Sequence, residues 1–103
     1  MIDDLLQSVD LLLCPTMGML PVALDGLTFE EVISPERAHD LLSFTAPFSL
    51  SGSPTISLPC GFSTEGLPFS LQIIGRHGDE SLVMQAGCAY EEATEWHKQR
   101  PPV

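Results

Sequence analysis

Two stretches of the chain contain side chains that could act as nucleophiles. Ser51-Gly52-Ser53 places two serines around a glycine, but the nucleophile elbow of hydrolases needs Gly-x-Ser-x-Gly between a strand and a helix. Here the expected order is helix and then strand, so we interpret the tripeptide as a helix terminator and turn. Cys60 follows a proline at a strand end and is a better-placed thiol, although no base adjoins it in sequence. Because most cysteines are small buried apolar groups, a structural role is the favoured interpretation of Cys60.

Histidines and carboxylates could supply metal ligands or acid–base groups. The segment His77–Glu80 lacks two ligands on one helical face and lacks paired cysteines, so it predicts a loop histidine beside an N-cap aspartate, Asp79. His97 is expected at an exposed helix end, where it interacts with the helix dipole. Glu91, Glu92 and Glu95 fall on the polar face of an amphipathic helix, which predicts a solvated face rather than a catalytic carboxylate pair.

None of these groups completes an active site, and the sequence has no Gly-rich phosphate loop. The three cysteines, Cys14, Cys60 and Cys88, form no zinc-like or redox pair, which indicates reduced thiols in a cytoplasmic protein. We therefore predict no catalytic, cofactor-binding or metal-binding residue in this chain, and no cofactor.

The elements that would position these side chains follow from hydrophobic periodicity and capping residues. Apolar residues on one side predict a short helix at Ile2–Ser8. The apolar run Asp10–Cys14 predicts an interior strand of a parallel or mixed sheet, buried on both faces. A long loop is expected over Pro15–Ser34. Ser34 then caps a helix that runs to about residue 44, and a second short helix begins at a Thr45 cap and ends at a glycine, residue 52.

The second half of the chain predicts a hairpin and a long helix. Polar and apolar residues alternate in Thr55–Leu58 and Phe69–Ile74, and the turn residues Ser63–Gly66 would join these strands as an antiparallel pair. The last helix, Asp79–His97, has one apolar stripe. The stripe comprises Leu82, Ala86, Ala89, Ala93 and Trp96, widened by Val83 and Tyr90. This order predicts an α/β fold with a small mixed sheet of about three strands covered by helices.

Composition limits the function classes. The chain has 103 residues, 44% of them hydrophobic, which suits a single domain or fragment over residues 1–103 and excludes a disordered tail. No apolar run approaches the ~20 residues of a membrane span, and the start has no secretory-signal pattern. Four basic against fourteen acidic residues disfavour nucleic acid and anionic membranes as partners. A mean hydropathy of +0.18 favours apolar surface that a protein partner covers.

Four segments carry a pattern when taken in order. They are Asp10–Thr16 (DLLLCPT), Phe44–Phe62 (FTAPFSLSGSPTISLPCGF), Gly66–Arg76 (GLPFSLQIIGR) and the last helix, with Asp79-Glu80, Ala89-Tyr90-Glu91, Ala93-Thr94 and Trp96-His97. Together they resemble the C-terminal region of the amidase signature family, which includes amidases and the related component of glutamyl-tRNA amidotransferases.

The resemblance implies part of a mixed α/β sandwich whose full-length members hydrolyse amides, or transfer ammonia from them, through a Ser–Ser–Lys triad. In the family that triad lies N-terminal to the matched region, and the only lysine of this chain is Lys98. Ser49 stands where the family usually has asparagine, and Ser70 stands where it usually has glycine. The resemblance thus implies a C-terminal portion of an amide hydrolase, inactive alone, in which Pro15–Ser34 and the turn around Cys60 come nearest to a pocket wall.

Two other interpretations stay open. The chain could be a free-standing, non-catalytic α/β module that self-associates or binds a partner, or a decayed gene product without a selected role. A sheet of about three strands leaves unpaired edges, which predicts either a homodimer or higher oligomer, with two-fold symmetry as the default, or a missing N-terminal amidase portion as the partner.

Overall fold

The computed structural model describes residues 1–23 and 25–103, so Leu24, within the expected loop, lies outside the described residues. The strands are β1 (Leu12–Pro15), β2 (Thr55–Phe62) and β3 (Pro68–Ile74). The helices are α1 (Ile2–Ser8), α2 (Phe29–Val32), α3 (Pro35–Leu42), α4 (Ala46–Ser51) and α5 (Glu80–Ala93), followed by the 3-10 turn η1 (Trp96–Lys98). The expected α/β fold, with a three-stranded sheet and helices, is confirmed. No helix in the described residues combines the length and apolar character needed to cross a membrane.

The β2–β3 hairpin has the predicted antiparallel pairing. The Ser63 amide donates to the Leu67 carbonyl at 2.8 Å, and Gly66 adopts a φ of +82°, which closes the turn at a conformation that favours glycine. The register shifts between Pro59 and Gly61, so Cys60 is the extra residue of a β-bulge. Both strands extend further toward the turn than their alternating patterns predict.

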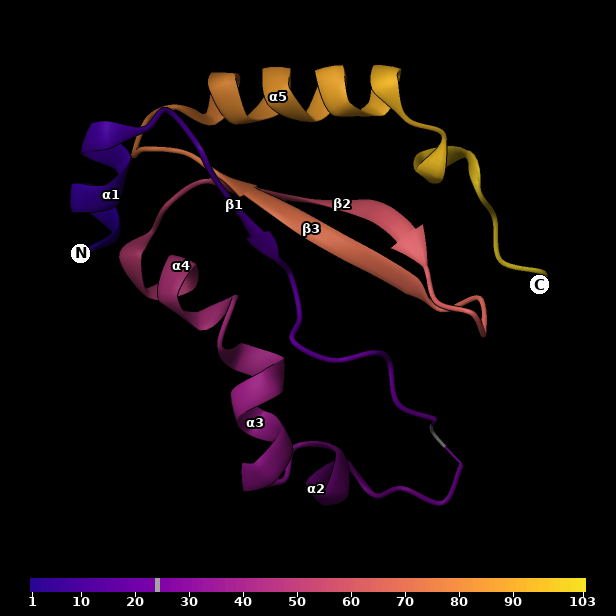
Figure 1. Ribbon diagram of the computed structural model, residues 1–103. Coiled ribbons are helices and arrows are strands. Elements are labelled where there is room, and N and C mark those ends of the chain that lie inside the picture. Colours follow the sequence, from indigo (N-terminus) through magenta and orange to yellow (C-terminus); the bar gives the residue numbers. More distant parts are fainter. Residues whose placement is uncertain (24) are drawn as a thin grey trace.

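β1 differs from its predicted role as an interior strand of a parallel or mixed sheet. The strand order is β1-β3-β2, β1 pairs antiparallel with β3, and the sheet is antiparallel throughout. Leu13, opposite Ile73, is 69% exposed, so this strand is not buried on both faces. The reason is that α5 packs over β2 and β3 and leaves β1 at an open edge (Figure 1).

The main core lies between α5 and one face of the sheet. Gly87 brings α5 close to β2, since a Cβ at Gly87 would lie 2.9 Å from Ile56 Cδ1. Val83 fills the space beside the β3 end, where a Cβ on Gly75 would come within 2.6 Å of its Cγ2. The buried hydrophobic residues are Leu6, Leu58, Ile73, Ile74 and Val83. This core is small for a chain of 103 residues.

The last helix ends earlier than predicted. α5 stops at Ala93 because Thr94 turns to an extended conformation and its hydroxyl donates to the Tyr90 carbonyl at 2.9 Å. Trp96 therefore leaves the predicted stripe and packs on Phe62, with ring centroids 6.2 Å apart. Because Gly87 packs closely on β2, the side of α5 that faces the sheet is formed by Val83, Gly87 and Tyr90. Ala89 and Ala93, which belong to the predicted apolar stripe, are exposed.

The remaining helices largely match the sequence pattern. α1 has the predicted bounds, and α3 and α4 begin directly after the predicted N-cap residues Ser34 and Thr45, although neither side chain makes a capping hydrogen bond. α2 was not predicted; it occupies part of the expected loop, where Thr28 and Glu31 form a capping box.

The molecule is extended. Its principal extents are 45 × 33 × 18 Å, and its radius of gyration is 15.5 Å, against about 13 Å for a compact chain of this length. Its accessible surface is 7230 Å², whereas surface scaling gives about 5,700 Å² for a compact protein of this mass. In Figure 1, α2, α3 and α4 form an arm below the sheet. The chain thus leaves surface open that a compact domain would bury.

Candidate functional site

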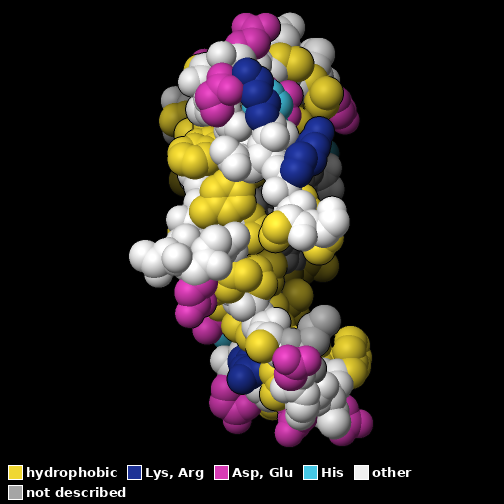
Figure 2. All heavy atoms as spheres, turned by 90° about the vertical axis from the view of Figure 1, so that its right-hand side faces the viewer, with side chains coloured by type: hydrophobic (Ala, Val, Ile, Leu, Met, Phe, Trp, Pro, Cys, Tyr) yellow, Lys and Arg dark blue, Asp and Glu magenta, His cyan; other side chains and the backbone are white. Residues whose placement is uncertain are grey.

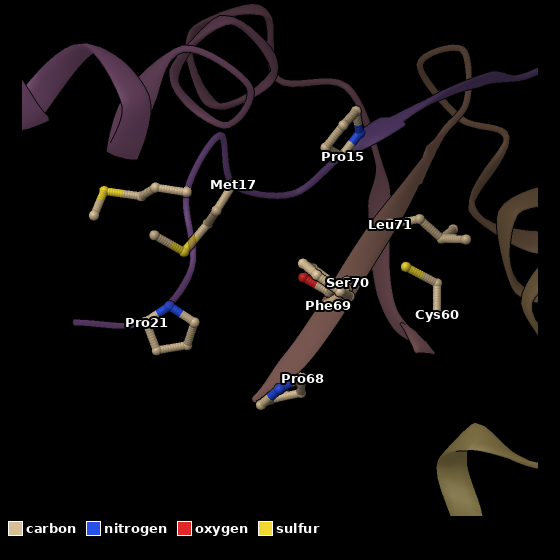
Figure 3. Close-up of a pocket in the computed structure, with 9 residues that line it drawn as sticks. Pro15, Met17, Pro21, Cys60, Pro68, Phe69, Ser70 and Leu71 are labelled. Carbon is tan, nitrogen blue, oxygen red and sulfur yellow. The ribbon is translucent and has the colours of Figure 1, made fainter. Parts of the chain in front are cut away.

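An apolar cavity of about 470 Å³ lies at the β3 end nearest the hairpin turn (Figure 3). It joins the two segments expected to lie nearest a pocket wall, the start of the loop after β1 and the bulge at Cys60. The lining residues are Pro15, Met17, Met19, Pro21, Cys60, Pro68, Phe69, Ser70 and Leu71. Thioethers, prolines and aromatic carbons dominate this lining, so the cavity suits apolar groups and offers little acid–base chemistry.

In residues 1–23 and 25–103, no hydrogen bond links the Cys60 thiol to a base that could activate it. Its side chain lies on the same side of β3 as Leu71, opposite Met17 and Pro21 (Figure 3). Burial, and secondarily the nearby Cys60, raises the pKa of the Tyr90 phenol, whose hydroxyl donates to the Pro59 carbonyl at 2.9 Å. A phenol that stays protonated at neutral pH cannot deprotonate the thiol. Cys60 therefore fits the structural role favoured from the sequence.

Cys14 is held as a neutral thiol. Burial raises its pKa, and the Gln72 amide, which donates to its Sγ at 3.3 Å, opposes this only in part. A raised thiol pKa lowers the fraction of thiolate, the nucleophilic form. This environment makes Cys14 poorly suited to act as a nucleophile.

A polar cavity of about 300 Å³ separates α4 from the other face of the sheet. The hydroxyls of Thr16 and Ser57 are 2.9 Å apart, and Gln72, which is 4% exposed, donates from Nε2 to the carbonyls of Pro15 and Phe44. The lining residues are Thr16, Thr45, Phe48, Ser49, Ser53, Thr55, Ser57 and Gln72. These bonds tie the segment before α4 and the loop after β1 to the sheet. This polar cluster was not predicted from the sequence. The signal for it was the alternation of polar and apolar residues in the two strands, which places Ser57 and Gln72 on one face of the sheet.

Ser51-Gly52-Ser53 is a helix terminator, as predicted. Gly52 is the C-cap of α4, with a φ of +72°. The Ser51 hydroxyl donates to the Phe48 carbonyl at 3.1 Å and lies 2.7 Å from the Ser53 hydroxyl. The serine pair thus stabilises the end of a helix.

Lys98 cannot complete a Ser–Ser–Lys arrangement with this serine pair. η1 packs at the end of β2 near Phe62, whereas Ser51 and Ser53 precede the start of β2. Eight residues of strand span roughly 26 Å. The Lys98 ammonium lies 2.8 Å from the Glu95 carboxylate, and this contact lowers the pKa of Glu95.

The histidines and acidic residues also act structurally. His77 is an exposed loop residue, as predicted. Asp79 is the N-cap residue of α5, but its side chain makes no capping hydrogen bond, because its carboxylate oxygen lies 3.6 Å from a guanidinium nitrogen of Arg76 instead. His97 is not an exposed helix end: it lies half-buried in η1, and its Nδ1 is buried without a hydrogen-bond partner. Of the three glutamates expected on a solvated helix face, Glu92 is exposed on α5, Glu91 is half-buried there, and Glu95 is exposed but follows the end of the helix as the N-cap of η1. Within residues 1–23 and 25–103, no group of three or more His, Cys, Asp or Glu side chains is arranged to hold a metal ion.

Comparison with known proteins places these elements in a larger fold. The family model described as Amidase matches residues 1–84. A glutamyl-tRNA(Gln) amidotransferase component from Oceanobacillus iheyensis is 46% identical over 99 residues, which are 96% of this chain and 20% of that protein. The putative amidase AmiD of Mycobacterium tuberculosis is 41% identical over 94% of this chain and 20% of its own length.

A solved structure shows the same arrangement of elements. The structure of 6-aminohexanoate cyclic dimer hydrolase superposes with a TM-score of 0.70 at 36% identity, covering 90% of this chain and 21% of that chain. The chain therefore spans about one-fifth of the length of the relatives that it matches.

Proposed function

The chain belongs to the amidase family, and on that premise we propose that it is the C-terminal portion of an amide (carbon–nitrogen bond) hydrolase, inactive without the part that holds the Ser–Ser–Lys triad. Its partner is then the N-terminal amidase portion, which this sequence lacks. The three free cysteines support a cytoplasmic location for the assembled protein.

The observation that carries the proposal is the share of each chain in the match. Relatives 39–46% identical align with nearly all of this chain but with only about 20% of themselves. The structural match to a hydrolase has the same proportions. A segment with this relation to whole enzymes supplies sheet, helices and pocket wall to a fold whose catalytic groups lie elsewhere.

The geometry of the isolated chain supports the proposal that it is inactive by itself. Acyl transfer needs a nucleophile, a base and oxyanion donors that converge on one carbonyl. Here the Ser51–Ser53 pair caps α4, and Lys98 pairs with Glu95 at the far end of β2. The described lining of the cavity at Met17 and Phe69 includes no carboxylate, histidine or lysine that could replace the triad.

An assay of the purified chain tests the inactivity. We expect no release of acid above background from a series of simple amides, measured by mass spectrometry. The proposal would be contradicted by turnover that is abolished by Cys60→Ala but not by the matched variant Cys88→Ala, and that a chelator does not affect. That result would make Cys60 the nucleophile.

A chimera tests the structural role directly. Residues 1–103 replace the matched segment of 6-aminohexanoate cyclic dimer hydrolase, and hydrolysis of the cyclic dimer is measured. We expect a folded chimera that retains measurable hydrolysis, because the superposition covers 90% of this chain. A folded chimera without any hydrolysis would count against the chain as a working portion of an amide hydrolase.

A free-standing self-associating module is the second candidate, favoured by the extended shape and the large accessible surface. Thermal unfolding of the purified chain separates the two. A cooperative transition favours the module, whereas a molten or aggregated chain favours a portion that needs the rest of its fold.

A further inference from the structure

Two largely apolar cavities meet at Pro68, at the hairpin end of the sheet. The 470 Å³ cavity by Met17 and Phe69 and a second one of about 740 Å³ by Phe62 and Trp96 share Pro68 in their walls. We call their combined surface the Pro68 groove. It draws on three segments far apart in sequence: the loop after β1, the β2–β3 hairpin and the residues after α5. In Figure 2, hydrophobic side chains gather in a band along the face that includes this end of the molecule.

The groove exposes large side chains that a finished protein normally covers. Met17, Phe62, Phe69 and Trp96 are each 39–44% exposed. Single exposed apolar residues are ordinary, but a contiguous apolar patch marks an interaction surface. The other strongly exposed apolar side chains, such as Leu50 on α4 and Met84 on α5, lie outside both cavities.

Charge separates the groove from the rest of the surface. The chain carries a net charge of −10, yet among the described residues no acidic side chain lines either cavity, and Arg100 is the one Lys or Arg there that does. The groove is therefore suited to a packed apolar interface. A second copy of this chain would bring the same charge of −10 with it, which opposes close approach.

We propose that the Pro68 groove is the surface that the remaining four-fifths of the amidase chain covers; this rests on the proposed function. The accessible surface exceeds that of a compact protein by about 1,500 Å², whereas a standard interface removes about 800 Å² from each partner. This excess is spread over the whole elongated chain, so the groove is one part of the surface that the rest of the fold would cover. The missing length, about 80% of the relatives, supplies a body of sufficient size.

Thiol labelling of matched methionine variants tests this assignment. Met17→Cys places a reporter in the groove, and Met84→Cys places one on the outer face of α5; both methionines are exposed in the free chain. Each variant is made in the free chain and in the chimera with the cyclic dimer hydrolase, and labelling at each cysteine is followed by peptide mass spectrometry. We expect labelling at position 17 to be at least about tenfold slower in the chimera, since buried interface sites react only when the interface opens. Labelling at position 84 should be equal in both.

The outcomes separate the groove from the proposed function. A folded, active chimera in which position 17 is labelled as fast as in the free chain would overturn the groove assignment alone. Slow labelling at position 17 in the free chain, restored by dilution to monomer, would assign the groove to a second copy and also overturn it. A chimera that fails to fold would contradict both proposals.

Discussion

Arg76 connects three parts of the molecule through one side chain. Its Nε donates to the Leu6 carbonyl at 2.7 Å, and a terminal nitrogen donates to the Val9 carbonyl at 2.8 Å, so it satisfies carbonyls at the end of α1. The carboxylates of Asp10 and Asp79 lie 3.4 and 3.6 Å from the same guanidinium. A planar group with five donors suits this multiple contact, whereas lysine offers a single ammonium.

Replacing Arg76 should release α1 from the sheet. We expect Arg76→Met to lower the free energy of unfolding by about 2 kcal/mol, because hydrogen bonds from charged donors are lost and carbonyls are left without partners. Denaturant unfolding followed by circular dichroism measures this loss. Arg100→Met, at an exposed position near the C-terminus, is the control and should change little. Equal effects of the two variants would show that Arg76 contributes no more than a surface charge.

At the scale of single elements, α2 shows how local bonds hold a helix of four residues. The Thr28 amide donates to the Glu31 carboxylate at 2.7 Å, and the Glu31 amide donates to the Thr28 hydroxyl at 3.3 Å. The backbone bond from Thr28 is the largest cause of a lowered pKa at Glu31, followed by the bond from its side chain. The carboxylate form thus stabilises the capping box.

The lowered pKa makes the stability of α2 depend on pH. The contribution of the Glu31 carboxylate is fully present above its ordinary pKa of 4.5 and is lost as the pH falls through its lower folded value. We expect Thr28→Ala to move the pKa of Glu31 back toward 4.5, measured by NMR titration. Thr64→Ala, in the exposed hairpin turn, is the matched control. An unchanged pKa in Thr28→Ala would mean that the capping box does not form in solution.

Elements defined by local chemistry were predictable from the sequence. Helix α4 ends at Gly52 because a left-handed glycine there satisfies the last carbonyls, and the hairpin turn closes at Gly66 for a similar local reason. The capping box of α2 also had a local signal, Thr28 and Glu31 three residues apart, which the expectation of a long loop obscured.

Features set by packing between distant segments were not predictable. The run Leu11–Cys14 is apolar throughout, and only the position of α5 decides that Leu13 stays exposed at an edge. The position of Trp96 after the end of α5 depends on its contact with Phe62, 34 residues earlier in the chain. At the site, the cluster around Gln72 needs the strand register as well as the composition of each strand.

For the whole molecule, the decisive property is that the sheet has two open edges. The order β1-β3-β2 leaves β1 and β2 on the outside of the sheet formed by the described residues. Exposed edges pair readily with other strands, while a net charge of −10 on each chain opposes contact between copies. The balance between these two effects is sensitive to salt, because repulsion between exposed charges is screened over about 10 Å at 0.1 M ionic strength.

The isolated chain should therefore self-associate, and more strongly at higher salt. Light scattering at low micromolar concentration should give a mass above 11.2 kDa that rises with ionic strength, because screening removes repulsion but leaves strand pairing intact. Leu13→Lys adds a charge to the edge strand β1 at an exposed position, so it should shift the chain toward monomer without unfolding it. Leu50→Lys, on the exposed face of α4, is the matched control and should leave the mass unchanged. A monodisperse species of 11.2 kDa at every salt concentration would show that the chain closes its own core and that its edges do not pair.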